Sequence, residues 1–550
     1  MAKKSTKKED KGLNLESILF NCRDYLRGNA SLNDKRDLLL TLVFLRFIGE
    51  KFEEAQLKMR QECLNQGFED ENIITAFLNS PNRYKNIAFV PEAARWSMLI
   101  SVPSTKLNGA LDDALQAIND SGNALKGCVR LGLFSTINLD SNVIKKVVDE
   151  VNKISHKTFG EEKDLIGRVY EYFLKSFAVN ATKEDGEFYT PHDIVELIAA
   201  FIKPFDGTLY DPCCGSGGMF VQCAKYVEAK QGDISMVNVY GQESDPATYR
   251  LAKMNLAVRG ISHHLGEKNA STFTNDMHKG LTFDYIMANH PFNLKSWYDT
   301  ILSNDERWAD YSLPPESNAN YAWILHILSK LKAGKGVAGF LLANGALGDT
   351  DAQSIRQKLI ENDKVEAIIV LPRELFYTTD ISVTLWILNE NKKGGLWHGR
   401  QLRNRVHEIL FMDLRQWAIN PVKGEQKKKF VLSAEQIKRA SEIYFKWQSE
   451  GTDGKNFSEP ELYRSVGVYD IDGIEANNFS LVPSRYIKFE DRDNGIDYEE
   501  VLSDTAKTVS ELLKKQKEND TTLRNAFKLL GYELCISYIK KWRKNLISYK

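Results

Sequence analysis

An asparagine, a histidine, a proline and a phenylalanine follow one another at Asn289, His290, Pro291 and Phe292, directly after the apolar run "FDYIMA". An exocyclic aromatic amine is a weak nucleophile, because its lone pair is delocalised into the ring. The Asn289 side-chain oxygen and the His290 carbonyl can accept both hydrogens of such an amine, which localises the lone pair. Phe292 can stack on the base, a contact of about 1–3 kcal/mol that any base can make. The tetrad therefore suits a base that has been flipped out of a duplex.

The side chain of His290 has more than one interpretation. Its imidazole can act as a general base, but the amine need not lose a proton before it attacks. An aromatic ring at the rim of a pocket more often packs or contacts solvent than does chemistry. We therefore favour the interpretation in which His290 contributes only its carbonyl, with Pro291 biasing it toward extended geometry. A degenerate site that binds cofactor without turnover is a third interpretation.

A second group of candidate residues lies in "LYDPCCGSGGMF" and "VNVYGQE". Glycines between a strand and a helix let the backbone turn sharply and approach a ligand. Glu243, at the end of the next strand, suits the hydroxyls of a ribose. Both features fit a dinucleotide or another adenosine cofactor, whereas a glycine-rich turn without function is the plainer interpretation. The candidate loop residues are Asp211, Gly215, Ser216, Gly217 and Gly218.

Two features of this loop separate the possible cofactors. The loop has neither the third glycine of G-x-G-x-x-G nor the Lys-Ser/Thr of a phosphate-binding loop, so a pyrophosphate is not obviously provided for. Asp211 suits a cationic amine. S-adenosylmethionine has an adenosine, a ribose and an ammonium but no phosphate, so the loop favours this cofactor.

A third candidate segment is "GEFYTPHDIVELIAAFI". Thr190 can cap the amphipathic helix that follows, and Pro191 can begin it. Phe188, Tyr189 and the open amides of that helix start can close over the cofactor, with the amides facing its carboxylate.

The elements that position these residues change in kind along the chain. The first part reads as helices, among them one that Ser31 can cap and the segment "EKDLIGRVYEYFLKSFAV". From "GTLYD" onward, β-rich runs alternate with helices, which predicts a doubly wound, mostly parallel, Rossmann-like α/β sheet. Ligands in such sheets lie at the carboxyl ends of the strands. The predicted segments are a disordered tail (1–12), a helical N-terminal domain (13–178), a catalytic domain (179–395), a mixed extension (396–497) and C-terminal helices for partner docking (498–550).

Composition excludes several classes of protein. The seven cysteines are scattered and never form C-x-x-C pairs, which favours a reducing cytoplasm over a disulfide framework or a structural zinc site. The nine histidines predict no metal site, and the adjacent His263 and His264 are expected on a solvated loop. No apolar run approaches the ~20 residues of a membrane span. The net charge is −1, which suggests that any electrostatic attraction to DNA phosphates is local or is supplied by a partner.

In their order along the chain, "GEFYTP", "DPCCGSGGM", "GQE" and "ANHPFN" resemble the modification (methylation) subunit of type I restriction-modification systems, a family of site-specific N6-adenine DNA methyltransferases. The segment from "AGFLLANGALGDT" to "SVTLWILNENKK" looks like the later catalytic block of that family. The resemblance covers nearly the whole chain. It departs at His290, where the family pattern reads Asn-Pro-Pro-Phe.

This resemblance implies roles for named residues. Asn289, His290, Pro291 and Phe292 would bind and activate a flipped adenine. The methyl donor, S-adenosylmethionine, would contact Glu187, Phe188, Tyr189, Thr190, Pro191, His192, Asp211, Gly215, Ser216, Gly217, Gly218 and, through its ribose, Glu243. The implied partners are double-stranded DNA, a specificity subunit between two copies of this chain, and in some complexes a restriction subunit. The alternatives are a methyltransferase of protein glutamine or RNA, and a scaffold subunit with a vestigial pocket.

Overall fold

The computed structural model describes residues 15–84, 88–121, 125–154, 190–376, 382–417, 419, 430–488 and 498–529. The chain divides into two compact units, Met1–Lys488 and Phe489–Lys550, and each is described by itself. None of the helices in these ranges is long and apolar enough to cross a membrane.

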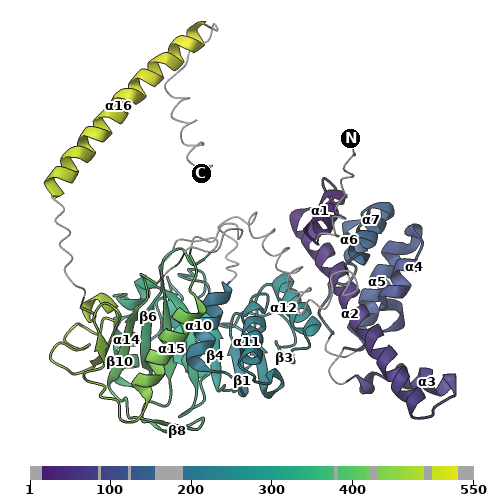
Figure 1. Ribbon diagram of the computed structural model, residues 1–550, viewed down its shortest axis with the longest axis horizontal. Helices are drawn as coiled ribbons and strands as arrows, with labels where there is room; N and C mark the ends of the chain where they lie inside the picture. Colours follow the sequence, from purple (N-terminus) through teal and green to yellow (C-terminus); the bar gives the residue numbers. More distant parts are fainter. Residues whose placement is uncertain are drawn as a thin grey trace, which may run out of the picture. The chain divides into compact units, whose positions relative to one another are not determined.

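The first part of the larger unit is helical, as its sequence predicts (Figure 1). Ser31 caps the longest helix of this part by accepting a hydrogen bond from the Asp34 amide at 3.1 Å. The expected helix "EKDLIGRVYEYFLKSFAV" lies outside the described residues. The helices are α1 (Leu15–Tyr25), α2 (Leu32–Asn65), α3 (Glu71–Leu78), α4 (Trp96–Ser101), α5 (Ser104–Asp120), α6 (Leu133–Ile137) and α7 (Ser141–Asn152).

A mixed sheet forms the second part of this unit. In the described ranges its order is β11-β12-β10-β6-β7-β5-β4-β1-β2-β3. Strands β3, β2, β1, β4 and β5 are parallel neighbours, whereas β7 runs antiparallel between β5 and β6. The strands are β1 (Gly207–Asp211), β2 (Val237–Gly241), β3 (His263–His264), β4 (Tyr285–Ala288), β5 (Val337–Ala343), β6 (Val365–Val370), β7 (Val383–Asn389), β10 (Glu408–Asp413), β11 (Ser458–Glu459) and β12 (Tyr463–Gly467). The predicted doubly wound α/β fold is confirmed.

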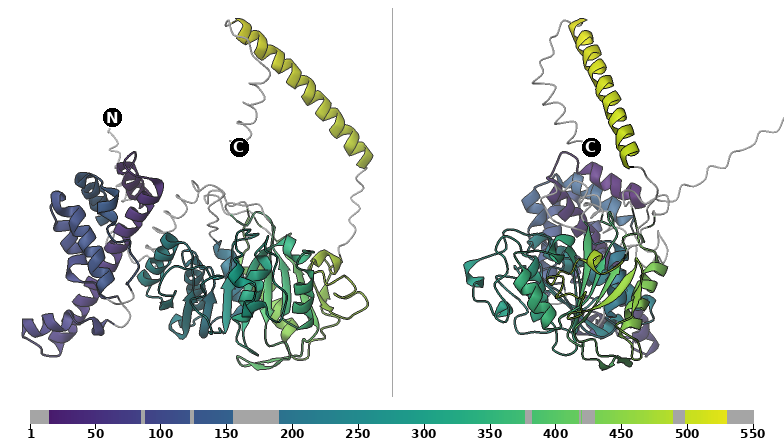
Figure 2. Two further views of the ribbon diagram at one scale, coloured as in Figure 1. Left: turned by 180° about the vertical axis from the view of Figure 1, so that it is seen from behind. Right: turned by 90° about the vertical axis from the view of Figure 1, so that its left-hand side faces the viewer.

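Helices cover both faces of the sheet, as Figures 1 and 2 show. One face packs against α10 (His192–Ile202), α11 (Gly218–Ala229), α12 (Pro246–Val258) and α15 (Ala434–Gln448), and the other against α13 (Asn320–Ser329) and α14 (Gln353–Glu361). Side chains of β4 alternate between the faces: Tyr285 and Met287 lie on the α10 side, and Ile286 and Ala288 on the α13 side. If the alternation continues past the end of β4, the side chain of Asn289 begins on the α10 side of the sheet and that of His290 on the α13 side.

Helix α10 lies very close to the sheet. A Cβ atom on Gly339 of β5 would stand 2.8 Å from Ile198 Cγ2 of α10, so only glycine permits this approach without a shift. Helix α12 also contributes buried side chains to the core of the N-terminal helices, namely Leu251, Met254 and Val258. Helix α12, which follows β2, is therefore packed against both cores.

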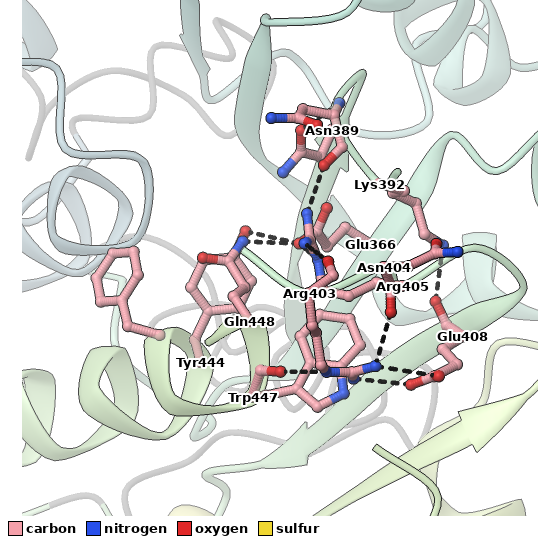
Figure 3. Close-up of polar contacts among 12 residues, drawn as sticks. Glu366, Asn389, Lys392, Arg403, Asn404, Arg405, Glu408, Tyr444, Trp447 and Gln448 are labelled. Carbon is pink, nitrogen blue, oxygen red and sulfur yellow. Dashed lines mark hydrogen bonds and ion pairs between the residues drawn. The ribbon is translucent and has the colours of Figure 1, made fainter. Parts of the chain in front are cut away.

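A buried polar network holds the C-terminal extension against the sheet (Figure 3). Glu366 of β6 and Arg405 form an ion pair at 3.0 Å with both side chains fully buried. Gln448 of α15 donates to the same Glu366 oxygen at 2.7 Å. A hairpin of β8 (Gly395–Trp397) and β9 (Arg400–Leu402) precedes Arg405. Because Glu366 lies at the beginning of β6, the network is at the opposite end of that strand from its carboxyl end.

The structure corrects two expectations. Thr190 does not cap the helix that follows it: α10 begins at His192, its N-cap residue is Pro191, and no side-chain capping bond is found in the described part of the chain. His263 and His264 form the short edge strand β3 rather than a solvated loop, because their backbone pairs with Val239 and Tyr240 of β2.

The remaining elements are short helical turns and one long helix. The 3₁₀ turns are η1 (Pro81–Arg83), η2 (Glu92–Ala94), η3 (Ile234–Met236), η4 (Thr300–Leu302), η5 (Glu306–Trp308), η6 (Asn344–Leu347) and η7 (Pro483–Arg485). In the smaller unit, α16 (Tyr498–Leu529) is a single helix that begins where the sequence predicts the C-terminal helices to begin (Figure 1).

Candidate active site

The side chain of Asn289 lies at the carboxyl end of β4 and bonds to the segment before α10. Its Nδ2 donates to the Thr190 hydroxyl oxygen at 2.8 Å, across 99 residues of sequence. Its Oδ1 is buried and has no hydrogen-bond partner among the described residues. Buried polar atoms are nearly always paired, so an unpaired acceptor at a strand end indicates a place for an external donor.

The ring of His290 is buried, with 1% of the residue exposed. It is nearly parallel to the ring of Trp323 on α13, with an interplanar angle of 14°. Burial lowers the pKa of His290 to about 4, against a weaker opposing effect of the Pro291 carbonyl. The imidazole is therefore neutral near pH 7, and it packs on the α13 side of the core.

Phe292 is half-buried and packs against the core on the α10 side. Its ring meets that of His290 edge to face, with centroids 6.1 Å apart. The next residue, Asn293, has a φ of +54° and exchanges hydrogen bonds with the buried Asn320 of α13: its amide donates at 3.0 Å and its Oδ1 accepts at 2.9 Å. These two hydrogen bonds hold the backbone directly after the tetrad against α13. No local sequence pattern predicts them, because the two residues are 27 positions apart.

The glycine loop between β1 and α11 is fastened to the neighbouring strand end. The Gly215 amide donates to Glu243 Oε2 at 3.0 Å, and the Ser216 carbonyl accepts from Asn255 Nδ2 at 2.8 Å. Gly215 and Gly217 have φ values of +53° and +73°, which L residues with a side chain rarely adopt. The loop therefore needs glycine at both positions to make this turn.

Two carboxyl groups flank the loop. Asp211 is buried, and its Oδ1 accepts from the Cys213 amide at 3.0 Å. Burial, with a smaller contribution from Glu243, raises the pKa of Asp211 to about 7. Burial also raises the pKa of Glu243, whose Oε1 accepts from the Asp245 amide at 2.8 Å. Two partly desolvated carboxyl groups favour a ligand that carries a cation and hydroxyl donors, which fits S-adenosylmethionine.

The structure brings several of the predicted residues together. It joins Thr190 to Asn289, and Gly215 to Glu243. The strand order places β4, β1 and β2 side by side, so Asn289, Asp211 and Glu243 lie at three adjacent carboxyl ends. Glu187, Phe188 and Tyr189 lie outside the described residues, and His192 begins α10. The roles of all these residues stay predictions.

Several side chains that support the site are buried or nearly so, and the sequence did not predict them. Gln242, inside the quoted "GQE", is fully buried and donates to the carbonyls of Ala270 and Asn275. Arg307 donates from Nη1 to the Thr272 carbonyl at 3.0 Å. These residues hold the segment that follows β3 beside the glycine loop between β1 and α11. Such partners are far away in sequence, so no local pattern identifies them.

Comparisons with known proteins agree with this geometry. A family model described as N-6 DNA Methylase matches residues 161–494, and one described as HsdM N-terminal domain matches residues 15–151. The chain is 34% identical over 466 residues to the type I restriction enzyme HindI methylase subunit of Haemophilus influenzae, covering 81% of this chain and 100% of that one. It is 31% identical to the MjaIX methylase subunit of Methanocaldococcus jannaschii, covering 93% of this chain and 90% of the relative.

A solved structure shows the same fold. The methyltransferase subunit of a type I restriction-modification system from Streptococcus thermophilus matches with a TM-score of 0.68 at 23% identity, over 86% of this chain and 98% of that chain. The family models cover both the helical part and the sheet, and the relatives match nearly end to end. The chain therefore belongs to the N-6 DNA methylase family and, within it, to the methylase subunits of type I restriction enzymes.

Proposed function

We propose that this chain transfers the methyl group of S-adenosylmethionine to the exocyclic N6 of an adenine flipped out of duplex DNA. The observation that carries the proposal is the buried Asn289 Oδ1, which has no partner within the described ranges although its own amide nitrogen is bonded. An acceptor of this kind at the carboxyl end of β4 is complementary to an amine hydrogen.

Each residue of the tetrad has a separate role in binding or activating the base. Asn289 Oδ1 and the His290 carbonyl accept the two amine hydrogens, which moves the nitrogen lone pair out of conjugation. Pro291 keeps His290 extended, so that its carbonyl stays beside the amide. Phe292 stacks on the flipped ring. The chain lowers the barrier mainly by alignment of nitrogen with the methyl carbon, since no proton has to leave before attack.

The methyl donor is bound by the glycine loop and by the two carboxyl groups beside it. When bound, S-adenosylmethionine supplies an electrophilic methyl group on a sulfonium. Asp211 would hold its positive charge and Glu243 would accept from its ribose hydroxyls. The turn around Gly215, Ser216, Gly217 and Gly218 would let the ligand approach the backbone closely. The first amides of α10, which begins at His192, would face its carboxylate.

Partners complete the proposed complex. A specificity subunit reads the DNA sequence, two copies of this chain flank it, and a restriction subunit joins in some assemblies. The net charge of −1 supports a division of labour in which a partner supplies much of the contact with phosphates. Five apolar residues of α16 are exposed and fall on one face at helical spacing: Leu502, Val509, Leu513, Leu523 and Phe527. We assign this face to docking of the specificity subunit.

The test is the chemical identity of the product. The chain, combined with its specificity subunit, is given methyl-labelled S-adenosylmethionine and duplex DNA, and the DNA is digested to nucleosides. The proposal expects label in N6-methyladenine. Label in protein or RNA would support a different planar nitrogen as substrate. Donor binding without any methylation, with every partner present, would support the scaffold interpretation.

A further inference from the structure

The bond between Thr190 and Asn289 has a use beyond holding two segments together. A side-chain amide presents an acceptor at one end and two donors at the other. If the amide turns over, the substrate amine meets N–H groups instead of an oxygen. The proposed chemistry, on which this inference rests, therefore requires something in the protein to decide which end of Asn289 faces the base.

Among the described residues, one hydroxyl bonds to this amide, and together with the substrate amine it sets the orientation. The Thr190 oxygen stands 2.8 Å from Asn289 Nδ2 and accepts one of its hydrogens, while Oδ1 is left buried and unpaired among the described residues. In the reverse orientation the hydroxyl could donate to Oδ1, but the amide hydrogens would then face the hydrogens of the substrate amine. With the amine bound, only the orientation in which Thr190 accepts pairs every group.

Thr190 is itself held firmly. Pro191 restrains it to extended geometry, and its β-branched side chain has restricted χ1 freedom. The helix that follows is almost entirely buried, and Asp193 in its first turn accepts from the Leu432 amide at 2.9 Å. The hydroxyl is therefore carried by the start of a helix locked against the sheet and the C-terminal extension.

We propose that Thr190 is a positioning residue for catalysis: its hydroxyl accepts an N–H of the Asn289 carboxamide and so turns Oδ1 toward the substrate amine. Thr190 lies one residue before the N-cap residue Pro191, and its hydroxyl bonds to Asn289 rather than to the first turn of α10. It also separates Thr190 from residues that touch the methyl donor, because its effect is exerted through Asn289.

The experiment measures single-turnover methylation and donor affinity in the complex with the specificity subunit. Thr190→Val keeps the shape but removes the acceptor, and we expect the rate to fall about tenfold, as for loss of one buried hydrogen bond, with donor affinity changed less than twofold. Thr190→Ser restores the acceptor and should recover most of the lost rate. Thr208→Val is the matched control, because it removes a hydroxyl bond to Asp284 at the amino end of β1; its rate should stay within twofold of wild type.

A double-mutant cycle tests the mechanism. Asn289→Asp replaces the amide by a carboxylate with two equivalent oxygens, so its orientation no longer matters. Adding Thr190→Val to this variant should change the remaining rate less than twofold. If Asn289→Asp has no measurable rate, the comparison of the valine and serine variants decides.

Three results would overturn the inference: a valine variant as fast as wild type, a serine variant as slow as the valine one, or a loss of donor affinity with an unchanged rate. Failure of the proposed function is distinguishable, since then wild type transfers no methyl to DNA. In that event, hydrogen exchange of the ¹⁵N-labelled Asn289 side-chain amide still tests the orientation. Exchange should be faster in Thr190→Val, and equal rates would reject the role of Thr190.

Discussion

The imidazole of His290 lies against the indole of Trp323, with ring centroids 5.4 Å apart and an interplanar angle of 14°. The histidine that interrupts an otherwise familiar tetrad thus points into the protein core. Neighbouring residues of β4 alternate between the two faces of the sheet, so Asn289 and His290 diverge just after the strand ends. The amide turns toward Thr190 and the ring toward α13.

His290→Pro should keep methylation within about threefold of wild type, because the carbonyl remains and Pro291 already requires extended geometry. The pKa of about 4 also predicts that no inflection in the rate between pH 6 and 8 comes from this imidazole. The measurement is a pH profile of single-turnover methylation. His290→Phe, which keeps a ring against Trp323, is the folding control. An inactive proline variant that binds donor normally would mean that the imidazole takes part in catalysis.

Donor affinity should rise as pH increases through about 7. Burial raises the pKa of Asp211 to about 7, so the carboxyl is largely protonated below that pH and charged above it. The cationic donor favours the charged form, so its binding releases a proton below this range. Asp211→Asn should bind more weakly and with little pH dependence. Calorimetry in buffers of different ionisation enthalpy measures the released protons, and an equal pH dependence in both proteins would contradict the assignment.

Arg405→Met should destabilise the larger unit by about 3–5 kcal/mol, because it leaves Glu366 buried without its cation. Chemical denaturation measures this change. The control is Lys438→Ala, which breaks the exposed pair with Glu442 on α15 and should cost less than about 0.5 kcal/mol. Since the pair is at the beginning of β6, the folded variant should bind donor with wild-type affinity. A cost below 1 kcal/mol would show that Glu366 is satisfied without Arg405.

Substitution on the apolar face of α16 should prevent assembly with the specificity subunit. Leu523→Asp places a charge on that face, and its side chain is 50% exposed, so the fold should tolerate the change. The control, Thr522→Asp, introduces the same charge one position earlier, on the other side of the helix. Co-purification should be lost for the first and kept for the second. Deletion after residue 497 should also abolish the complex, and a truncated chain that still co-purifies would exclude this helix as the docking element.

The sequence predicted the longer strands of the α/β sheet and most helices because each carries its own apolar pattern, and strand ends followed from those patterns. Asn289 and Glu243 could therefore be placed at the functional edge of the sheet. The bond from Thr190 to Asn289 could not, because it joins residues 99 positions apart and replaces a local cap. The short strand at His263 also escaped, since its backbone pairing with β2 carries no apolar signal. The same limit applies to Gln242, Asn255 and Arg307, whose partners are defined only by the folded chain.

Asn289, as the acceptor of an amine hydrogen, is the residue on which the proposed chemistry depends most. The direct measurement compares wild type and Asn289→Ala, each with its specificity subunit, for donor affinity and for single-turnover transfer to duplex DNA. We expect donor affinity within about threefold of wild type and a transfer rate reduced at least about 100-fold, the usual size for loss of a preorganised polar group. An alanine variant that methylates adenine within tenfold of the wild-type rate would contradict the account.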